Sequence, residues 1–155
     1  STPILFNQQP LTQVSSTRIL GVIVDSDVSW SGHIDFIVRK TCTKIGALRR
    51  CFRQLSLKAT RQFILSVILP DLLYCCSCFA MKLSAKDRQR LSSVYRRSVR
   101  AACGSKLQED VMPLLARLSI DPFEHYLIRS IAKFIHVNHV VFPLPNLTDL
   151  FPQVS

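Results

Sequence analysis

The chain has 155 residues, of which 48% are hydrophobic, and its 20 lysines and arginines outnumber 10 aspartates and glutamates to give a formal net charge of +10. The apolar content argues against an intrinsically disordered chain, and the length fits one domain or two small subdomains that share a core. The positive charge favours a polyanionic partner: nucleic acid is the first candidate, an anionic membrane surface the second, and a basic protein with neither ligand stays open.

Strands are predicted for the first 28 residues. The apolar run 4–6 leads into turn-forming residues 7–10, and residues 11–14 are predicted to return as the second strand of a hairpin. Residues 18–24 are rich in β-branched side chains and end at Asp25, which predicts one further strand.

The first helix is predicted to begin with Ser29 or Ser31 as its N-cap and to run to about Gln54, with Asp35 in its first turns. Apolar residues recur along it at helical spacing, and Thr41 is the one polar residue on that stripe. The apolar stripe comprises Trp30, Ile34, Ile37, Ile45, Leu48 and Phe52.

The opposite side of this helix is cationic. At about 100° per residue, Arg39, Arg50 and Arg53 fall together there, with Gly46 among them. One face is therefore predicted to lie in the core and the other to be strongly basic. The glycine would let a bound backbone approach the helix closely.

The second helix is predicted to start near Ser56 and to continue toward Phe79. Its sequence is almost continuously hydrophobic, which raises the question of a membrane span, for which about 20 apolar residues are needed. An aspartate at the centre of a span, where Asp71 lies here, costs about 2.5–3.5 kcal/mol on insertion. A buried helix, kinked or broken before Pro70, is therefore favoured.

The third helix has clear start and stop signals. Ser84 and Asp87 resemble a capping box, and Gly104 is predicted to end the helix after Cys103. The predicted inner face comprises Leu91, Val94, Tyr95, Ser98 and Ala102. The predicted outer face comprises Lys86, Arg90, Arg96, Arg97 and Arg100. The only acid of this helix lies in its first turn, so the outer face is predicted to be cationic.

Two further helices are predicted in the last third of the chain. Residues 111–118 are predicted to form a short one. The next begins with Asp121 as N-cap, Pro122 at the first helical position and Glu124 at the third, and reaches about Val141 before two prolines end it.

The six cysteines are predicted to be reduced, because the sequence shows no signal peptide and three of them crowd into one apolar segment. They are Cys42, Cys51, Cys75, Cys76, Cys78 and Cys103. A zinc site is the alternative. However, the crowded cysteines lack a second ligand pair at zinc-finger spacing, and His136 and His139 have no carboxylate or cysteine near them in sequence. Buried cysteines and surface histidines are expected instead.

Several short sequence motifs (phrases) follow one another here in the order and spacing that are typical of one protein family. Residues 20–25, 28–34 and 68–74 resemble its phrases "LGV-x-x-D", "L-S-W-x-x-H-I" and "I-x-P-x-L-x-Y", with Val28 in place of leucine. Residues 97–104 resemble the basic end of its next helix and the glycine stop. The family is that of the reverse transcriptases of LINE-type (non-LTR) retrotransposons.

The likeness covers most of the chain, since residues 118–122 and 149–151 resemble segments that lie after the thumb in many members. It implies a mainly α fold with a short N-terminal β-hairpin (α+β), built as a helical, thumb-like bundle. Residues 1–28 would be the end of the palm, residues 29–104 the thumb-like helical region, and residues 105–155 a C-terminal helical extension. Because the chain begins with Ser1, we expect a piece of a longer reading frame, with processing or a chosen boundary as alternatives.

The family's catalytic centre is expected upstream of this chain. There a Tyr/Phe-x-Asp-Asp motif binds two divalent metal ions that drive nucleotide addition. No such motif occurs here, and Asp25 and Asp27 match the loop after the "LGV" strand instead. The resemblance therefore implies a chain that is no enzyme by itself and holds no cofactor, with Mg²⁺ expected only for the parent RNA-directed DNA polymerase.

The task implied for a thumb is to grip the template–primer duplex by its backbone, which needs lysines and arginines on exposed helix faces. Between Asp35 and Asp71 there are eight basic residues and no acid. The predicted nucleic-acid-binding residues are Arg39, Lys40, Lys44, Arg49, Arg50, Arg53, Arg90, Arg96, Arg97 and Arg100. Charges that merely solvate helix faces are the alternative, although such faces usually mix signs.

The expected partners are RNA or an RNA–DNA hybrid and the upstream palm and fingers of the same polymerase, with no membrane. The expected location is intracellular, in nucleus and cytoplasm. Trp30, Tyr74 and Tyr95 are predicted to be core aromatics rather than platforms for base stacking. A stand-alone basic helical nucleic-acid-binding module and an inactive retroelement relic are the alternative functions, and a membrane-associated protein comes last.

Overall fold

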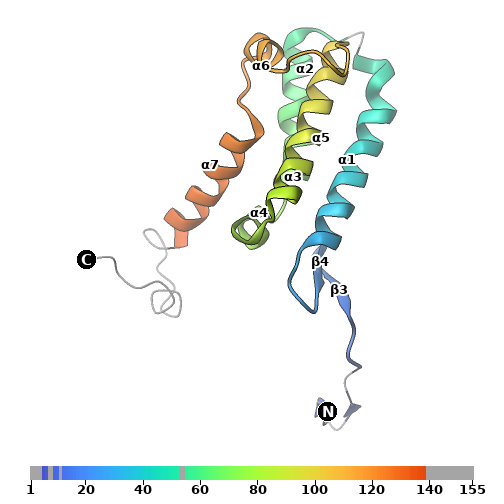
Figure 1. The fold of residues 1–155 in the computed structure, drawn as a ribbon, viewed down its shortest axis with the longest axis vertical. Coiled ribbons are helices and arrows are strands. Elements are labelled where there is room, and N and C mark those ends of the chain that lie inside the picture. Colours follow the sequence, from blue (N-terminus) through green and yellow to red (C-terminus); the bar gives the residue numbers. More distant parts are fainter. Residues whose placement is uncertain (1–4, 7–8, 11, 53–54, 139–155) are drawn as a thin grey trace, which may run out of the picture.

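The computed structural model of the chain describes residues 5–6, 9–10, 12–52 and 55–138. Its elements are β1 (Leu5–Phe6), β2 (Gln9–Pro10), β3 (Ser16–Ile19), β4 (Val22–Asp25), α1 (Ser31–Phe52), α2 (Leu57–Phe63), the π-helical turn η1 (Ile64–Ile68), α3 (Leu69–Leu73), α4 (Cys76–Phe79), the 3₁₀ turn η2 (Ala80–Lys82), α5 (Ala85–Cys103), α6 (Met112–Leu118) and α7 (Phe123–His136). The predicted mainly α fold with an N-terminal hairpin is confirmed. In Figure 1, α1 and α5 lie side by side, with the β3–β4 hairpin at the lower end of α1.

The strands differ from the prediction in two places. The run 18–24 is a hairpin and not one strand, because Leu20 and Gly21 form a two-residue turn between β3 and β4, with φ values of 48° and 87°. Positive φ at both central residues is the turn geometry that matches the twist of a hairpin. The partner of β1 is Gln9–Pro10, whereas residues 12–14 of the expected return strand are not in a strand.

Helix α1 has the predicted inner face. Trp30, Ile34, Ile37 and Ile45 are buried, and so is Thr41, while the side chains of Leu48 and Phe52 lie outside the described residues. The helix begins at Ser31, whose backbone N–H donates to the Ser29 hydroxyl over 3.4 Å. Asp35 lies just beyond the first turn, and its carboxylate forms an ion pair with Arg90 of α5.

The second predicted helix is continuous from Leu57 to Leu73. It contains a π-helical turn before Pro70, where a kink was expected. Ser56 caps it, because its hydroxyl accepts from the backbone N–H of Ala59 over 3.3 Å. The wider turn η1 directly precedes the segment with Pro70, which has no N–H to donate. The break comes later than predicted, at Cys75, whose φ is 55°.

The predicted bounds of α5 are confirmed. The Ser84 hydroxyl accepts from the backbone N–H of Asp87 over 3.0 Å, and Gly104 ends the helix with φ 68°. All five residues of the predicted inner face are buried. The predicted start of α7 is wrong by one position, because Pro122 is the N-cap and the Asp121 carboxylate pairs with Arg129 over 3.4 Å. The predicted end of this helix near Val141 falls outside the described residues.

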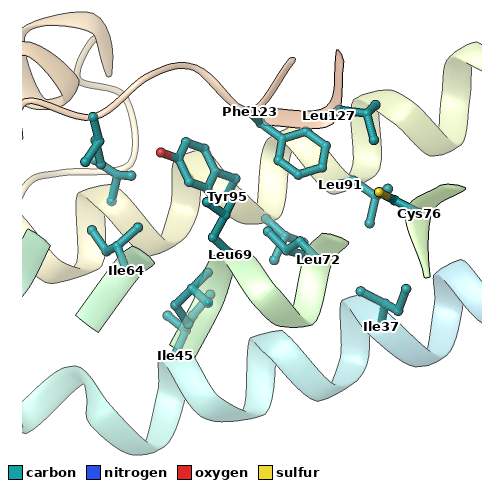
Figure 2. Packing of buried hydrophobic residues seen from close by; sticks show 14 of the residues in the cluster. Ile37, Ile45, Ile64, Leu69, Leu72, Cys76, Leu91, Tyr95, Phe123 and Leu127 are labelled. Carbon is teal, nitrogen blue, oxygen red and sulfur yellow. The ribbon is translucent and has the colours of Figure 1, made fainter. Parts of the chain in front are cut away.

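One hydrophobic core connects the elements. Its buried residues run from Val22 in β4 to Leu127 in α7, so the three predicted regions share it. Figure 2 shows Ile37 and Ile45 of α1, Leu72 of α3 and Tyr95 of α5 among the residues that face this core. Burying one large apolar side chain contributes about 1.5–3 kcal/mol, so burial of this many holds the helices together.

The long apolar segment belongs to this core. Ile64, Ile68, Leu72 and Phe79 are fully buried. Among the described helices, no single one has the length and apolar character to cross a membrane, although Leu57–Leu73 and Cys76–Lys82, bent by 41°, have them as a pair.

Candidate nucleic-acid interface

A hollow of about 930 Å³ lies between the C-terminal half of α1 and the part of α5 from Gln89 onward. Five basic residues and no acidic residue belong to its described lining, and we call it the basic groove. Its basic residues are Arg49, Arg96, Arg97, Arg100 and Lys106. Ile45 and Ala101 supply part of its floor, and Gly46 leaves α1 open there, since a Cβ at that position would meet no atom within 4 Å.

Helical spacing brings the arginines of α5 together. Arg96 and Arg100 are four residues apart, so they are neighbours along one side of the helix, and Arg97 lies beside them. Two backbone carbonyls orient the side chains: Arg96 Nε donates to Ser92 O over 3.4 Å, and Arg100 Nε donates to Glu109 O over 2.9 Å. Within the described part of the chain, none of the three forms an ion pair.

The other two cations enter from different segments. Arg49 extends from the last turns of α1 and is exposed. Lys106 comes just after the glycine that ends α5, and it was missed from the sequence because no periodic pattern extends past that stop. The carboxylate of Glu109 stands near this loop and accepts from the Ser105 hydroxyl. The groove is thus built from two helices and the turn after one of them.

Lys40 and Lys44 were predicted to bind nucleic acid, but the structure turns them toward α3. Their ammonium groups lie 2.9 and 2.5 Å from the two carboxylate oxygens of Asp71, whose side chain is 11% exposed. Burial alone raises the pKa of Asp71, but the hydrogen bonds from both lysines outweigh it, so the net shift of this pKa is downward. These lysines join α1 to α3 and do not line the basic groove.

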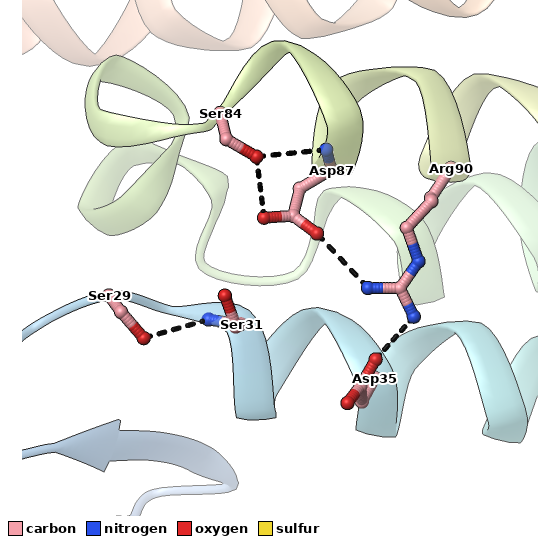
Figure 3. Close-up of polar contacts among 6 residues, drawn as sticks. All are labelled: Ser29, Ser31, Asp35, Ser84, Asp87 and Arg90. Atoms are coloured by element: carbon pink, nitrogen blue, oxygen red, sulfur yellow. Dashed lines mark hydrogen bonds and ion pairs between the residues drawn. The ribbon is translucent and has the colours of Figure 1, made fainter.

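Arg90 is likewise held by carboxylates, as Figure 3 shows. Its guanidinium contacts Asp35 of α1 and lies 3.0 Å from Asp87, which also accepts from the Ser84 hydroxyl over 2.8 Å. The hydrogen bond to Asp35 is the main cause that raises the pKa of Arg90, and the same contact lowers the pKa of Asp35. Arg90 therefore connects α1 to α5 through its ion pairs and does not line the basic groove.

The ten predicted residues thus divide into four sets. Arg49, Arg96, Arg97 and Arg100 line the basic groove. Lys40, Lys44 and Arg90 form ion pairs with carboxylates. Arg39 is exposed but does not line the groove, and the side chains of Arg50 and Arg53 lie outside the described residues. The cationic face predicted from Arg39, Arg50 and Arg53 is therefore seen only at Arg39.

His33 and Tyr74, which belong to the sequence motifs described above, attach the β3–β4 hairpin to the helices. His33 Nδ1 accepts from the backbone N–H of Ile23 over 3.3 Å, and the Tyr74 hydroxyl donates to Leu20 O over 2.7 Å. The Tyr74 ring lies 3.6 Å from the point where a Cβ of Gly21 would be, so it packs closely against the turn. These residues have a structural task in this chain.

The aromatic residues agree with the prediction in two cases of three. Trp30 and Tyr95 are buried, with Trp30 against Phe79 at a ring-centroid distance of 6.3 Å. Tyr74 is 50% exposed, because it packs its ring edge against the hairpin turn at the surface and not inside the core.

Asp25 caps a turn. Its carboxylate accepts from the backbone N–H and the hydroxyl of Ser29, over 2.8 and 2.7 Å, and the backbone bond is the largest cause that lowers the pKa of Asp25. Asp27 accepts from the Ser26 hydroxyl over 3.4 Å. Within the described ranges, no three histidine, cysteine, aspartate or glutamate side chains gather in a way that could hold a metal ion.

Comparison with known proteins identifies no relative of this chain. No model of a known protein family matches the chain, and comparisons with curated proteins and with solved structures find no match. The function is therefore inferred from the chain's own residues and geometry.

Proposed function

We propose that this chain is the non-catalytic C-terminal part of an RNA-directed DNA polymerase of a non-LTR retrotransposon. In this proposal the basic groove grips RNA or an RNA–DNA hybrid by its phosphate backbone, and the nucleotidyl-transfer chemistry, with its Mg²⁺, belongs to upstream palm and fingers. The observation that carries the binding role is the groove itself, where five cations gather without an acidic side chain in the described lining. The sequence phrases at residues 20–25, 28–34 and 68–74 supply the link to the polymerase family.

The basic groove is suited to contact the phosphate backbone of a nucleic acid and not to bind its bases. Arginine guanidinium groups stay charged at any physiological pH and match phosphate oxygens with paired donors. No aromatic side chain belongs to the described lining on which a base would stack. Phosphate contacts of this kind position a duplex without reading its sequence. Gly46 widens the approach, because it adds no side chain above α1.

The double variant Arg49→Ala/Arg97→Ala tests the binding role. Both side chains are exposed, so their removal should leave the fold intact. Each lost phosphate contact reduces the salt dependence of duplex binding by about 0.9 in the slope of log K against log [salt]. Titration of a fluorescent RNA–DNA hybrid over a salt series should therefore give weaker binding and a slope smaller by about 1.8.

A matched control removes the same charge elsewhere. Lys58 of α2 and Lys133 of α7 are also exposed and do not line the groove. Their double alanine variant should keep most of the affinity and the slope. Equal losses in the two double variants would mean that net charge, and not the groove, attracts the hybrid.

A stand-alone basic helical module is the second candidate, and one observation favours it. Residues from Val22 to Leu127 pack on one another in one core, so the binding surface has its own support. The genomic sequence upstream separates the two candidates. An open frame that contains the Asp-Asp motif supports the polymerase, and unrelated exons support the module. If the chain is an inactive relic, the purified chain is expected not to fold.

A further inference from the structure

We infer that Cys75 and Cys78 form a dithiol site that exchanges with low-molecular-weight disulfides of the glutathione type. The site lies at the break between α3 and α4, away from the basic groove, and the inference does not depend on the proposed function. It starts from a Cys-x-x-Cys spacing whose two ends the fold brings together.

The backbone closes this four-residue turn. The N–H of Cys78 donates to the carbonyl of Cys75 over 2.9 Å, and Cys75 has a left-handed conformation with φ 55°. This backbone bond closes the turn and brings the two residues together. The Cys78 thiol is among the causes that raise the pKa of Cys75, as expected for neighbouring thiols. Both thiols are free.

The surroundings give the two thiols different tasks. Cys78 is exposed and open to a reagent, whereas Cys75 is half-buried. Burial, and after it the neighbouring Cys78, raises the pKa of Cys75 above its ordinary value. Thiol–disulfide exchange begins at an accessible thiolate. Cys78 is therefore the attacking residue, and Cys75 is the residue that resolves the intermediate.

Cys76 lies between the two in sequence but differs from them in its burial. It is 5% exposed and belongs to the core. Burial raises its pKa, and its thiol has a side-chain hydrogen bond with Ser130 of α7. Cys76 is therefore shielded from the reagent that reaches the exposed Cys78.

The exchange balances in two steps. The Cys78 thiolate attacks one sulfur of R–S–S–R, a Cys78–S–S–R bond forms, and the released RS⁻ takes up the proton that Cys78 lost. The Cys75 thiolate, after losing its proton, attacks the Cys78 sulfur and releases the second RS⁻, which takes up that proton. Two protein thiols are oxidised to one disulfide, and one small disulfide is reduced to two thiols.

A single peptide makes this testable in the whole chain. Cleavage after Arg61 and Lys82 by trypsin leaves residues 62–82, which contain Cys75, Cys76 and Cys78 together. The chain is equilibrated with mixtures of reduced and oxidised glutathione, alkylated and digested. We expect the peptide to lose two hydrogens and to be alkylated once, at Cys76, and we expect reduced glutathione to reverse this.

Cysteine-to-serine variants identify the bond. Cys78→Ser, at an exposed position, should abolish the internal disulfide and leave no more than a mixed disulfide. Cys76→Ser should keep the disulfide, and Cys42→Ser and Cys103→Ser should leave its formation unchanged. The inference is overturned if the wild-type peptide never loses two hydrogens at any glutathione ratio, or if Cys78→Ser forms the disulfide as readily as the wild type.

Discussion

His33 is a buried base that the fold keeps neutral. It is 1% exposed, and its Nδ1 must be unprotonated to accept from the Ile23 N–H at 3.3 Å. Burial, assisted by the charge of Arg18, lowers the pKa of His33 below its usual range. A single imidazole thus connects the hairpin to α1 and makes this contact depend on protonation.

The sign of the pH effect is set by that shift. The unfolded chain binds the proton at His33 near pH 6.5, and the folded chain binds it only at lower pH. Stability from this group is therefore complete above about pH 7 and is lost as the pH falls through 6.5 toward the folded pKa.

Urea unfolding measured between pH 7.5 and 5 should show this loss, with a slope of up to about 1.4 kcal/mol per pH unit. The variant His33→Asn should lower stability at neutral pH and remove most of the slope in this range. His125, which is exposed, is the control: His125→Asn should keep the wild-type slope. An unchanged slope in His33→Asn would assign the pH dependence to another group.

At the scale of elements, ion pairs with carboxylates determine which basic side chains remain unpaired. Arg90 contacts Asp35 from α1 and Asp87 from its own helix, so it joins the two helices that form the basic groove. A second hollow, lined by Arg90, Lys86 and Arg97 among others, continues from the groove along the same helix pair. Removal of the α1 carboxylate would leave Arg90 paired with Asp87 alone and free one of its two guanidinium NH2 groups next to the groove.

The variant Asp35→Asn should strengthen binding of an RNA–DNA hybrid. The freed NH2 group of Arg90 adds up to one phosphate contact, so the slope of log K against log [salt] should become more negative by up to about 0.9. Asp27→Asn changes the net charge equally at an exposed position in the loop before α1 and should leave the slope unchanged. A weaker complex with Asp35→Asn would mean that the ion pair holds the groove in its binding shape.

At the scale of the whole molecule, one core joins the hairpin end to α7. Phe123 is 1% exposed and packs against Tyr95 at a ring-centroid distance of 6.0 Å, and the Tyr95 hydroxyl donates to Asp121 O over 2.8 Å. Trp30, the only tryptophan, lies near the hairpin and reports on the other end of the core. A continuous core predicts that both ends unfold together.

The variant Phe123→Ala should lower the free energy of unfolding by about 3–5 kcal/mol, because a large side chain leaves a cavity in the core. The fluorescence of Trp30 and the far-UV circular dichroism should move together to a lower midpoint. Phe134→Ala, at a side chain that is 46% exposed, is the control and should change stability little. Separate midpoints for the two signals would indicate that α7 unfolds independently.

The helical part of the fold could be predicted from sequence because its signals are local. Apolar spacing in α1 and α5 identified their inner faces, and the cap at Ser84 with the stop at Gly104 defined the bounds of α5. These rules depend on residues within one or two turns of each other. They failed at the 18–24 hairpin, because Leu20 is not a residue typical of a turn with positive φ and a β-branched run surrounds it.

The candidate site could be predicted only in part. Local charge patterning found the arginines of α5 and Arg49, since a cationic helix face is visible in the order of residues. Tertiary contacts decided which cations stay free: Asp71 approaches two lysines, and Asp35 approaches Arg90, across long stretches of chain. An ion pair forms where packing brings opposite charges together, and spacing along the chain carries no information on that. The sequence alone thus determined the main helices and their charge, and the packing of α1 against α3 and α5 determined which cations stay unpaired and line the basic groove.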